Sequence, residues 1–359
     1  MNLSSGKTIT AGYGKAALVL IFSWLSLYAQ AQSKKDIPVF DTSYYKIYPK
    51  YITARAFFSK KYTGFSMDGP DAQRTLRYSP NTPVSLGVGA TYGAVTLNLG
   101  AGLNFLNPNR KDKGKTKSLD LQSHIYTRKL AIDLYGQFYK GYFLSPKGIG
   151  VTNGEDYYLR RDVKVNLLGA SVYKLLNFDR FSYRAAFLQN EWQKKSAGTF
   201  LIGAEIYIGL IKGDSSLVPG TLASAYNQYG VVKTRFIEIG AGVGYAYTAV
   251  YKQHFFVTGS VAVNGDIGFV KENTATGNEN NTTFSPNVTV RAVAGYNSDT
   301  WSATASWVNN TIALNGNYAD ADYRLRTGNL RLTFAKRFKP GRKLKKKLEI
   351  IDDLPLPKN

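Results

Sequence analysis

The chain has 359 residues, of which 44% are hydrophobic and 14% aromatic, with 34 Gly, no Cys and a formal net charge of +22. The absence of Cys excludes disulfides, thiolate nucleophiles, Fe–S clusters and Cys-ligated zinc. The two histidines, His124 and His254, are too few for a three-His catalytic metal site, and we expect no cofactor. High Gly and Tyr with only two Met disfavour a bundle of membrane helices.

The N-terminus has the pattern of a secretory signal peptide. Lys7 and Lys15 precede a 12-residue apolar run, 16–27, which is followed by the small-residue cleavage site Ala29-Gln30-Ala31. Twelve helical residues reach about 18 Å, which is short of the roughly 30 Å hydrocarbon core of a bilayer. We therefore predict a signal peptide over 1–31, cleaved near Ala31–Gln32, rather than a membrane anchor.

Beyond this segment, the dominant pattern is an alternation of apolar and polar residues. From Val95 to Phe105 the odd positions are apolar and the even positions are polar or Gly. Similar runs of roughly 9 to 16 residues recur along the chain, about twice the strand length of a soluble sandwich and long enough to cross a bilayer. Candidate strands lie near 51–67, 84–92, 95–105, 117–127, 130–143, 162–174, 180–190, 198–211, 235–249, 253–269, 286–297, 300–312 and 323–338.

These runs predict an all-β fold, a transmembrane antiparallel up-and-down β-barrel over 49–338. Bacterial barrels of one chain have even strand numbers, so the thirteen candidates indicate about 12 strands, or 14 if the irregular segment 212–233 hides another. Short turns such as Arg128-Lys129 are expected on the periplasmic side and long loops outside. Residues 32–48 are then a periplasmic N-terminal arm, and 339–359 a basic periplasmic tail.

Several short motifs also resemble a known family. They are Tyr78-Ser79-Pro80-Asn81, Lys113 to Lys117 followed by Leu119-Asp120-Leu121-Gln122, Tyr139-Lys140-Gly141-Tyr142, and Gln189 to Gly198. Over roughly Tyr48 to Phe338 the chain resembles an uncharacterised Bacteroidetes-type family of bacterial outer-membrane barrels, domain of unknown function 4421. The resemblance implies a location in the outer membrane of a Gram-negative cell, and it implies no activity, substrate or catalytic residue.

The alternation assigns a mixed set of charges to the interior of the barrel: Arg55, Asp120, His124, Asp133, Lys164, Arg184, Glu205, Glu238, Asp266, Arg291, Arg331 and Arg337. A selective pore usually lines its constriction with one sign of charge, whereas mixed charges in a confined interior tend to pair. We therefore expect a salt-bridged, closed or narrow lumen. The segment 214–229, which breaks the loop alternation, is the candidate plug.

Three functions fit these observations. The first is a non-enzymatic barrel with a structural role or a narrow passage. The second is an outer-membrane lipid hydrolase that uses His124 as the base for a Ser on the same face, since Ser123 points to the opposite side. The third is a partner subunit of an envelope assembly. We expect no catalytic, cofactor-binding or metal-binding residue under the first.

The basic residues of one predicted outer loop indicate an anionic partner. They are Arg110, Lys111, Lys113, Lys115 and Lys117. Lys and Arg bind phosphate through charge-assisted hydrogen bonds, so these residues are candidates for contact with lipopolysaccharide and other outer-membrane lipid. Nucleic acid is not expected, because no aromatic residues are interleaved for stacking. The barrel-assembly machinery is the expected partner during insertion, and the sequence leaves the oligomeric state open.

Overall fold

The computed structural model describes residues 40–69, 75–93, 95–107, 111–275, 277–316 and 322–352. The predicted signal peptide, the first part of the predicted arm and the last seven residues of the tail lie outside these ranges.

The elements follow one another as strands joined by turns and short helices. Their bounds are β1 Tyr45–Ile47, β2 Ile52–Met67, β3 Leu76–Ser79, β4 Val84–Tyr92, β5 Val95–Leu103, η1 Asn104–Leu106, β6 Lys117–Asp120, β7 Ser123–Tyr126, β8 Leu130–Ser145, β9 Leu159–Leu175, η3 Arg184–Leu188, β10 Glu191–Gln193, β11 Ala197–Lys212, η4 Gly220–Ala225, β12 Val231–Tyr251, β13 Phe255–Thr274, β14 Asn278–Asn297, β15 Trp301–Asn315, β16 Asp322–Phe338 and α2 Arg342–Asp352.

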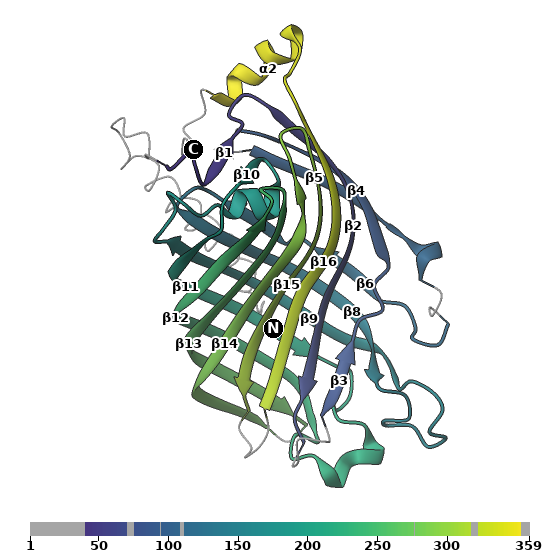
Figure 1. Ribbon diagram of the computed structural model, residues 1–359. Helices are drawn as coiled ribbons and strands as arrows, with labels where there is room; N and C mark the ends of the chain where they lie inside the picture. The colour runs from purple at the N-terminus through teal and green to yellow at the C-terminus, as the bar shows by residue number, and fades with distance from the viewer. Residues whose placement is uncertain are drawn as a thin grey trace, which may run out of the picture.

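The predicted antiparallel barrel is confirmed (Figure 1). In the described part of the chain, one sheet of 14 strands contains a closed ring of ten, which runs from β2 through β3, β8, β9 and β11 to β16. The ring closes where β16 pairs with β2 along its whole length, from Tyr323↔Met67 to Phe338↔Ile52. From β11 to β16 each strand pairs with the next one in the sequence, as expected for an up-and-down barrel.

The remaining four strands fill the wall between β2 and β8. β3 joins β2 to β8 through only three residue pairs on each side, at one end of the barrel. Towards the other end, β4 continues along β2 and carries β5, while β6 and β7 both pair with β8. In the described chain, β5 has no second strand partner, and neither have β6 and β7. In the described chain the wall therefore has no strand pairing between β5 and β6–β7.

The two faces of the wall differ as a bilayer requires. Large apolar side chains such as Val243, Val257 and Leu332 point outwards and are exposed, while polar ones such as Asn264 and Asn287 point inwards and are buried. This arrangement is the inverse of a soluble barrel and is typical of strands with lipid on one side. None of the described helices is both long and apolar enough to cross a membrane.

Four short turns lie together at one end. They follow β4, β7, β12 and β14, and this end also carries β1, β10 and α2 (Figure 1). The long connections 146–158 and 213–230 lie at the opposite end, together with the short link between β13 and β14, while the long connection 176–196 is the exception at the first end. Because periplasmic turns are short in barrels of this kind, we call these the periplasmic and the outer end.

One predicted strand is wrong. Residues 180–190 contain a single-turn π-helix, η3, and lie within the long connection between β9 and β11. The alternation in this stretch is interrupted by two consecutive buried residues, Ala185 and Ala186, which a strand would place on opposite faces. The connection instead folds into the barrel, and its end, β10, pairs with β1 of the N-terminal arm.

Candidate functional site

At the centre of the lumen lies a buried ion pair. The Arg291 guanidinium on β14 donates to the Asp133 carboxylate on β8, and both side chains are inaccessible to solvent. The second oxygen of Asp133 lies 2.6 Å from Nδ1 of His124 on β7. Because β14 and β8 lie on opposite sides of the ring, the ion pair between Arg291 and Asp133 connects opposite walls of the barrel. Of the predicted interior charges, these three come together as an ionic cluster.

The His124 cluster lacks the order of contacts that a serine hydrolase needs. Ser171 on β9 is the neighbouring hydroxyl, but its Oγ donates to Asp133 Oδ2 at 3.4 Å rather than to the imidazole. In a catalytic triad the histidine must contact the serine and the carboxylate must contact the histidine. Here the carboxylate lies in the middle, and among the described residues His124 Nε2 has no hydrogen-bond partner.

Three predicted lumen acids lie on adjacent strands. Glu205 on β11, Glu238 on β12 and Asp266 on β13 are all buried, and none forms an ion pair with a described residue. Two of them have neutral partners: Tyr173 and Tyr207 donate to Glu205 at 3.5 and 3.3 Å, and Asn287 donates to Asp266 at 2.9 Å. Both carboxylate oxygens of Glu238 lack a hydrogen-bond partner among the described residues. The expected pairing of acids with bases therefore holds for Asp133 and not for these three.

The glycine row opposite these acids has a specific packing role. A Cβ on Gly240 would lie 2.1 Å from an oxygen of Asp266, and one on Gly242 would lie 1.9 Å from Asn264 Oδ1. The space beside these glycines is filled by polar side chains of the next strand, β13.

The connection 176–196, here called the plug, packs into the periplasmic half of the lumen. Its Phe181 and Tyr183 are buried against barrel residues, and the Tyr183 hydroxyl lies 2.6 Å from Ser260 Oγ on β13. Two barrel arginines hold its backbone. Arg55 donates to the carbonyl of Leu188 and Arg337 to that of Gln189, each at 2.8 Å.

The plug also contains an internal ion pair and a left-handed turn. Arg184, predicted as a lumen residue on a strand, lies on η3 and pairs with Glu191 at 3.2 Å. Gln189 has φ of 53°, a conformation that non-Gly residues rarely adopt. Its carbonyl is the one that Arg337 binds. The barrel contact thus fixes the turn at which the plug reverses direction.

The segment 213–230, here called the cap, lies at the outer end and packs in part into the lumen. Leu217 and Val218 are fully buried in an apolar cluster that includes residues of β2, β3, β8, β9 and β12. The Tyr78 hydroxyl donates to the Leu217 carbonyl, and Gln228 Nε2 donates to the Asp68 carbonyl at 2.9 Å. Part of the segment predicted as the plug, around Leu217 and Val218, thus packs inside the outer mouth, and the segment 176–196 packs into the lumen at the other end.

The remaining predicted interior charges are distributed as follows. Asp120 accepts hydrogen bonds from Lys61 at 3.2 Å and from Tyr139 at 2.6 Å. The Arg331 guanidinium stacks on Phe57, 4.1 Å from the ring centre. Lys164 is exposed on the outside of β9, because its neighbours Val163 and Val165 point inwards into the apolar cluster of the outer mouth. Its predicted position in the lumen is wrong.

The loop cations and His254 are placed as follows. Arg110 lies outside the described residues, Lys111 and Lys115 are exposed, and Lys113 is stacked between Phe143 and Tyr157, 5.3 Å from each ring centre. His254 is half-buried between the rings of Trp192 and Tyr296 at the periplasmic end.

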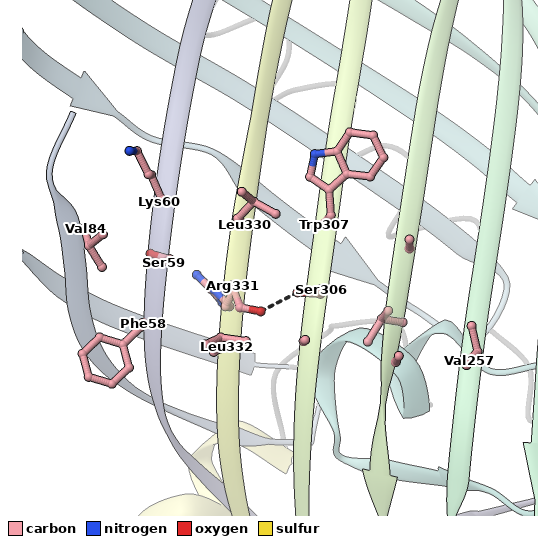
Figure 2. A pocket seen from close by; sticks show the side chains of 14 residues that line it. Phe58, Ser59, Lys60, Val84, Val257, Ser306, Trp307, Leu330, Arg331 and Leu332 are labelled. Carbon is pink, nitrogen blue, oxygen red and sulfur yellow. Dashed lines mark hydrogen bonds between the residues drawn. The ribbon is translucent and has the colours of Figure 1, made fainter. Parts of the chain in front are cut away.

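A hollow of about 410 Å³ lies on the outside of the wall, not in the lumen (Figure 2). Outward side chains of β2, β13, β15 and β16 line it, among them Phe58, Val257, Trp307, Leu330 and Leu332. Lys60 and the small residues Ala292, Ala294 and Ala305 also line it. Within the described chain, no group of three His, Asp or Glu residues is arranged to hold a metal ion.

A family model described as a domain of unknown function, DUF4421, matches residues 39–338. The chain belongs to this family. No curated protein matches this DUF4421 chain.

Several solved structures of outer-membrane barrels are similar to this DUF4421 barrel. OmpT of Vibrio cholerae is 10% identical, with 80% of this chain and 98% of that chain covered and a TM-score of 0.26. The toluene transporter TodX of Pseudomonas putida is 7% identical, with coverages of 80% and 90% and a TM-score of 0.24. An outer-membrane channel of Pseudomonas putida F1 is 10% identical, with coverages of 85% and 100% and a TM-score of 0.22.

The residues that sequence reasoning missed in this DUF4421 chain are those of the plug. Nothing in the alternation predicts that Arg55 and Arg337 bind backbone carbonyls 133 and 148 residues away. One signal was present: the family motif Gln189 to Gly198 begins at the reversal of the plug and includes β10. A motif rich in polar residues at the end of a predicted lipid-facing strand was evidence against that strand.

Proposed function

We propose that this protein is a non-enzymatic barrel of the outer membrane whose lumen is closed along its axis by its own plug and cap. The observation that carries the proposal is the hold of Arg55 and Arg337 on the plug backbone inside the ring. Such a segment makes no strand pair with the barrel, so it can leave without breaking the wall. The proposed role is therefore a closed passage that opens only when the plug moves.

The packing of the interior supports closure at rest. Inward polar residues at mid-height have side chains that are at most 1% exposed, among them Asp133, Gln137, Tyr207 and Arg291. A water-filled pore would leave such side chains accessible. Their hydrogen bonds cross the lumen: Asn310 on β15 donates to the Tyr207 hydroxyl on β11 at 2.7 Å. These side chains narrow the lumen between the plug and the cap.

The second candidate, a lipid hydrolase, has less support. It requires a serine hydroxyl at His124 Nε2, whereas the described serine of this cluster, Ser171, contacts Asp133. A buried His–Asp–Arg cluster that joins strands is sufficient to explain why these residue types occur together. We therefore assign His124 a structural role within the proposed function.

Planar-bilayer recording on refolded protein tests the proposal. Wild type should give no stable conductance of porin size. A variant in which residues 178–194 are replaced by a short Gly-Ser turn and 215–229 are deleted should conduct, provided heat-modifiable migration shows that it folds. Stable wild-type conductance would overturn the proposal, and so would a folded double variant that stays silent, because other residues would then close the lumen.

A further inference from the structure

A row of lysines crosses five adjacent strands at the outer end of the barrel. Strand register places Lys117 opposite Lys140, Lys140 opposite Lys164, Lys164 opposite Lys212, and Lys212 opposite Lys233. The row thus runs over β6, β8, β9, β11 and β12 without interruption. With about 4.8 Å between neighbouring strands, the five positions span about 19 Å. We call this row the lysine ladder.

The ladder faces outwards and lacks acidic partners. Lys117, Lys140, Lys164 and Lys212 are exposed, and Lys233 is half-buried. None of the five forms an ion pair with any residue in the described ranges. The nearby acid Asp162 is engaged instead by Arg160, whose Nη2 lies 2.8 Å from its Oδ2.

Such a row costs free energy unless something neutralises it. Like charges directly opposite each other on neighbouring strands destabilise a sheet, and here the repulsion is repeated four times. Arg235 and Lys271 add two more cations beside Lys233. Natural sheets commonly place opposite charges in cross-strand pairs, so an uninterrupted row of one sign points to an external anion with several charges.

The height of the ladder on the wall identifies where that anion lies. Further towards the periplasmic end, the same strands present Phe138, Leu168, Ile208 and Ile237, all outward and exposed. These residues form the apolar belt of the wall, so the ladder lies immediately beyond the belt on the outer side. In a bilayer this is the level of the outer-leaflet headgroups.

We infer that the lysine ladder binds the phosphorylated headgroup of a lipid in the outer leaflet, with the acyl chains lying on the belt below. The inference rests on the membrane location in the proposed function. Lysine suits this ligand because its ammonium group acts as a strongly hydrated point charge that binds phosphate without fixed geometry. A soluble polyanion would use the charges alone, whereas a lipid also uses the apolar residues beneath them.

Binding of a defined lipid to refolded protein in neutral detergent tests the inference without reference to conductance. The probe is an acylated glucosamine disaccharide carrying two phosphates, compared with the same lipid lacking phosphate. The test variant is Lys140→Gln/Lys164→Gln/Lys212→Gln. The matched control is Lys129→Gln/Lys252→Gln/Lys336→Gln, which removes the same charge from exposed positions near the periplasmic end.

The ladder variant should bind the phosphorylated lipid about 100-fold more weakly than wild type, since each basic residue at a lipid surface adds roughly a fivefold gain. The control should stay within twofold of wild type. Equal losses in both variants, equal binding of the lipid without phosphate, or full competition by inorganic phosphate at the concentration of the lipid would each overturn the inference. The lipid-free ladder variant should unfold at the same or higher denaturant concentration, because like charges are removed.

Discussion

Replacing Arg291 by Met should destabilise the barrel more than the loss of any surface charge. The Arg291 and Asp133 side chains are both fully buried, so the substitution leaves a carboxylate inside the lumen with only His124 and Ser171 as described hydrogen-bond partners. Removing one partner of a buried pair costs about 3–5 kcal/mol. Replacing both, in Asp133→Asn/Arg291→Met, should restore most of that loss, because no unpaired buried charge remains.

Denaturant unfolding of the refolded protein in micelles, followed by tryptophan fluorescence, measures these differences as a double-mutant cycle. The control pair is Lys46–Asp299 at the periplasmic end, whose side chains are 46% and 57% exposed. Lys46→Met should cost no more than about 1 kcal/mol, as surface pairs do. The reasoning is refuted if Arg291→Met costs less than 1 kcal/mol, or if the double variant is less stable than both single variants.

Three further results are expected. Gly242→Ala should destabilise by about 1–3 kcal/mol, because its Cβ would lie 1.9 Å from Asn264 Oδ1, whereas Gly259→Ala, with no atom within 4 Å, should have little effect on the unfolding midpoint. A hydrogen bond from Lys46 lowers the pKa of Asp299, so the contact between the arm and Asp299 contributes stability above the ordinary Asp pKa and loses it as pH falls through the lowered value. Pepsin cleavage of the arm should therefore increase on acidification. An Asp299→Asn variant whose cleavage kept the full pH dependence would contradict this. Ile239→Arg, on the lipid face of β12, should cost about 2–4 kcal/mol in vesicles, and a cost equal to that of Ile239→Leu would show the face to be wrongly assigned.

Much of the barrel could be predicted because its signal is local. Alternation along one strand reports which side chains meet lipid, and the outward rows containing Leu332 and Val243 follow from that rule alone. The rule fails where the interior is itself apolar. At the outer mouth Val163 and Val165 point inwards to meet the cap, so the polar Lys164 between them was assigned to the wrong side.

The candidate site was less predictable because its contacts are not local. The identities of Asp133, His124 and Arg291 as interior residues follow from strand parity, but their meeting depends on the width of the lumen and on the register of strands far apart in sequence. The lysine ladder has the same origin. Each lysine, taken singly, is an ordinary polar residue near the outer end of a strand. Only the register between the five strands places the lysines in one row.

The closed lumen can be tested directly at Ser260, whose Oγ contacts Tyr183 of the plug. The chain has no Cys, so a Ser260→Cys variant carries a single thiol. In vesicles, a polar maleimide should fail to label this thiol while the plug is present and should label it once residues 178–194 are replaced by a short turn. Rapid labelling in the protein with its plug intact would contradict closure.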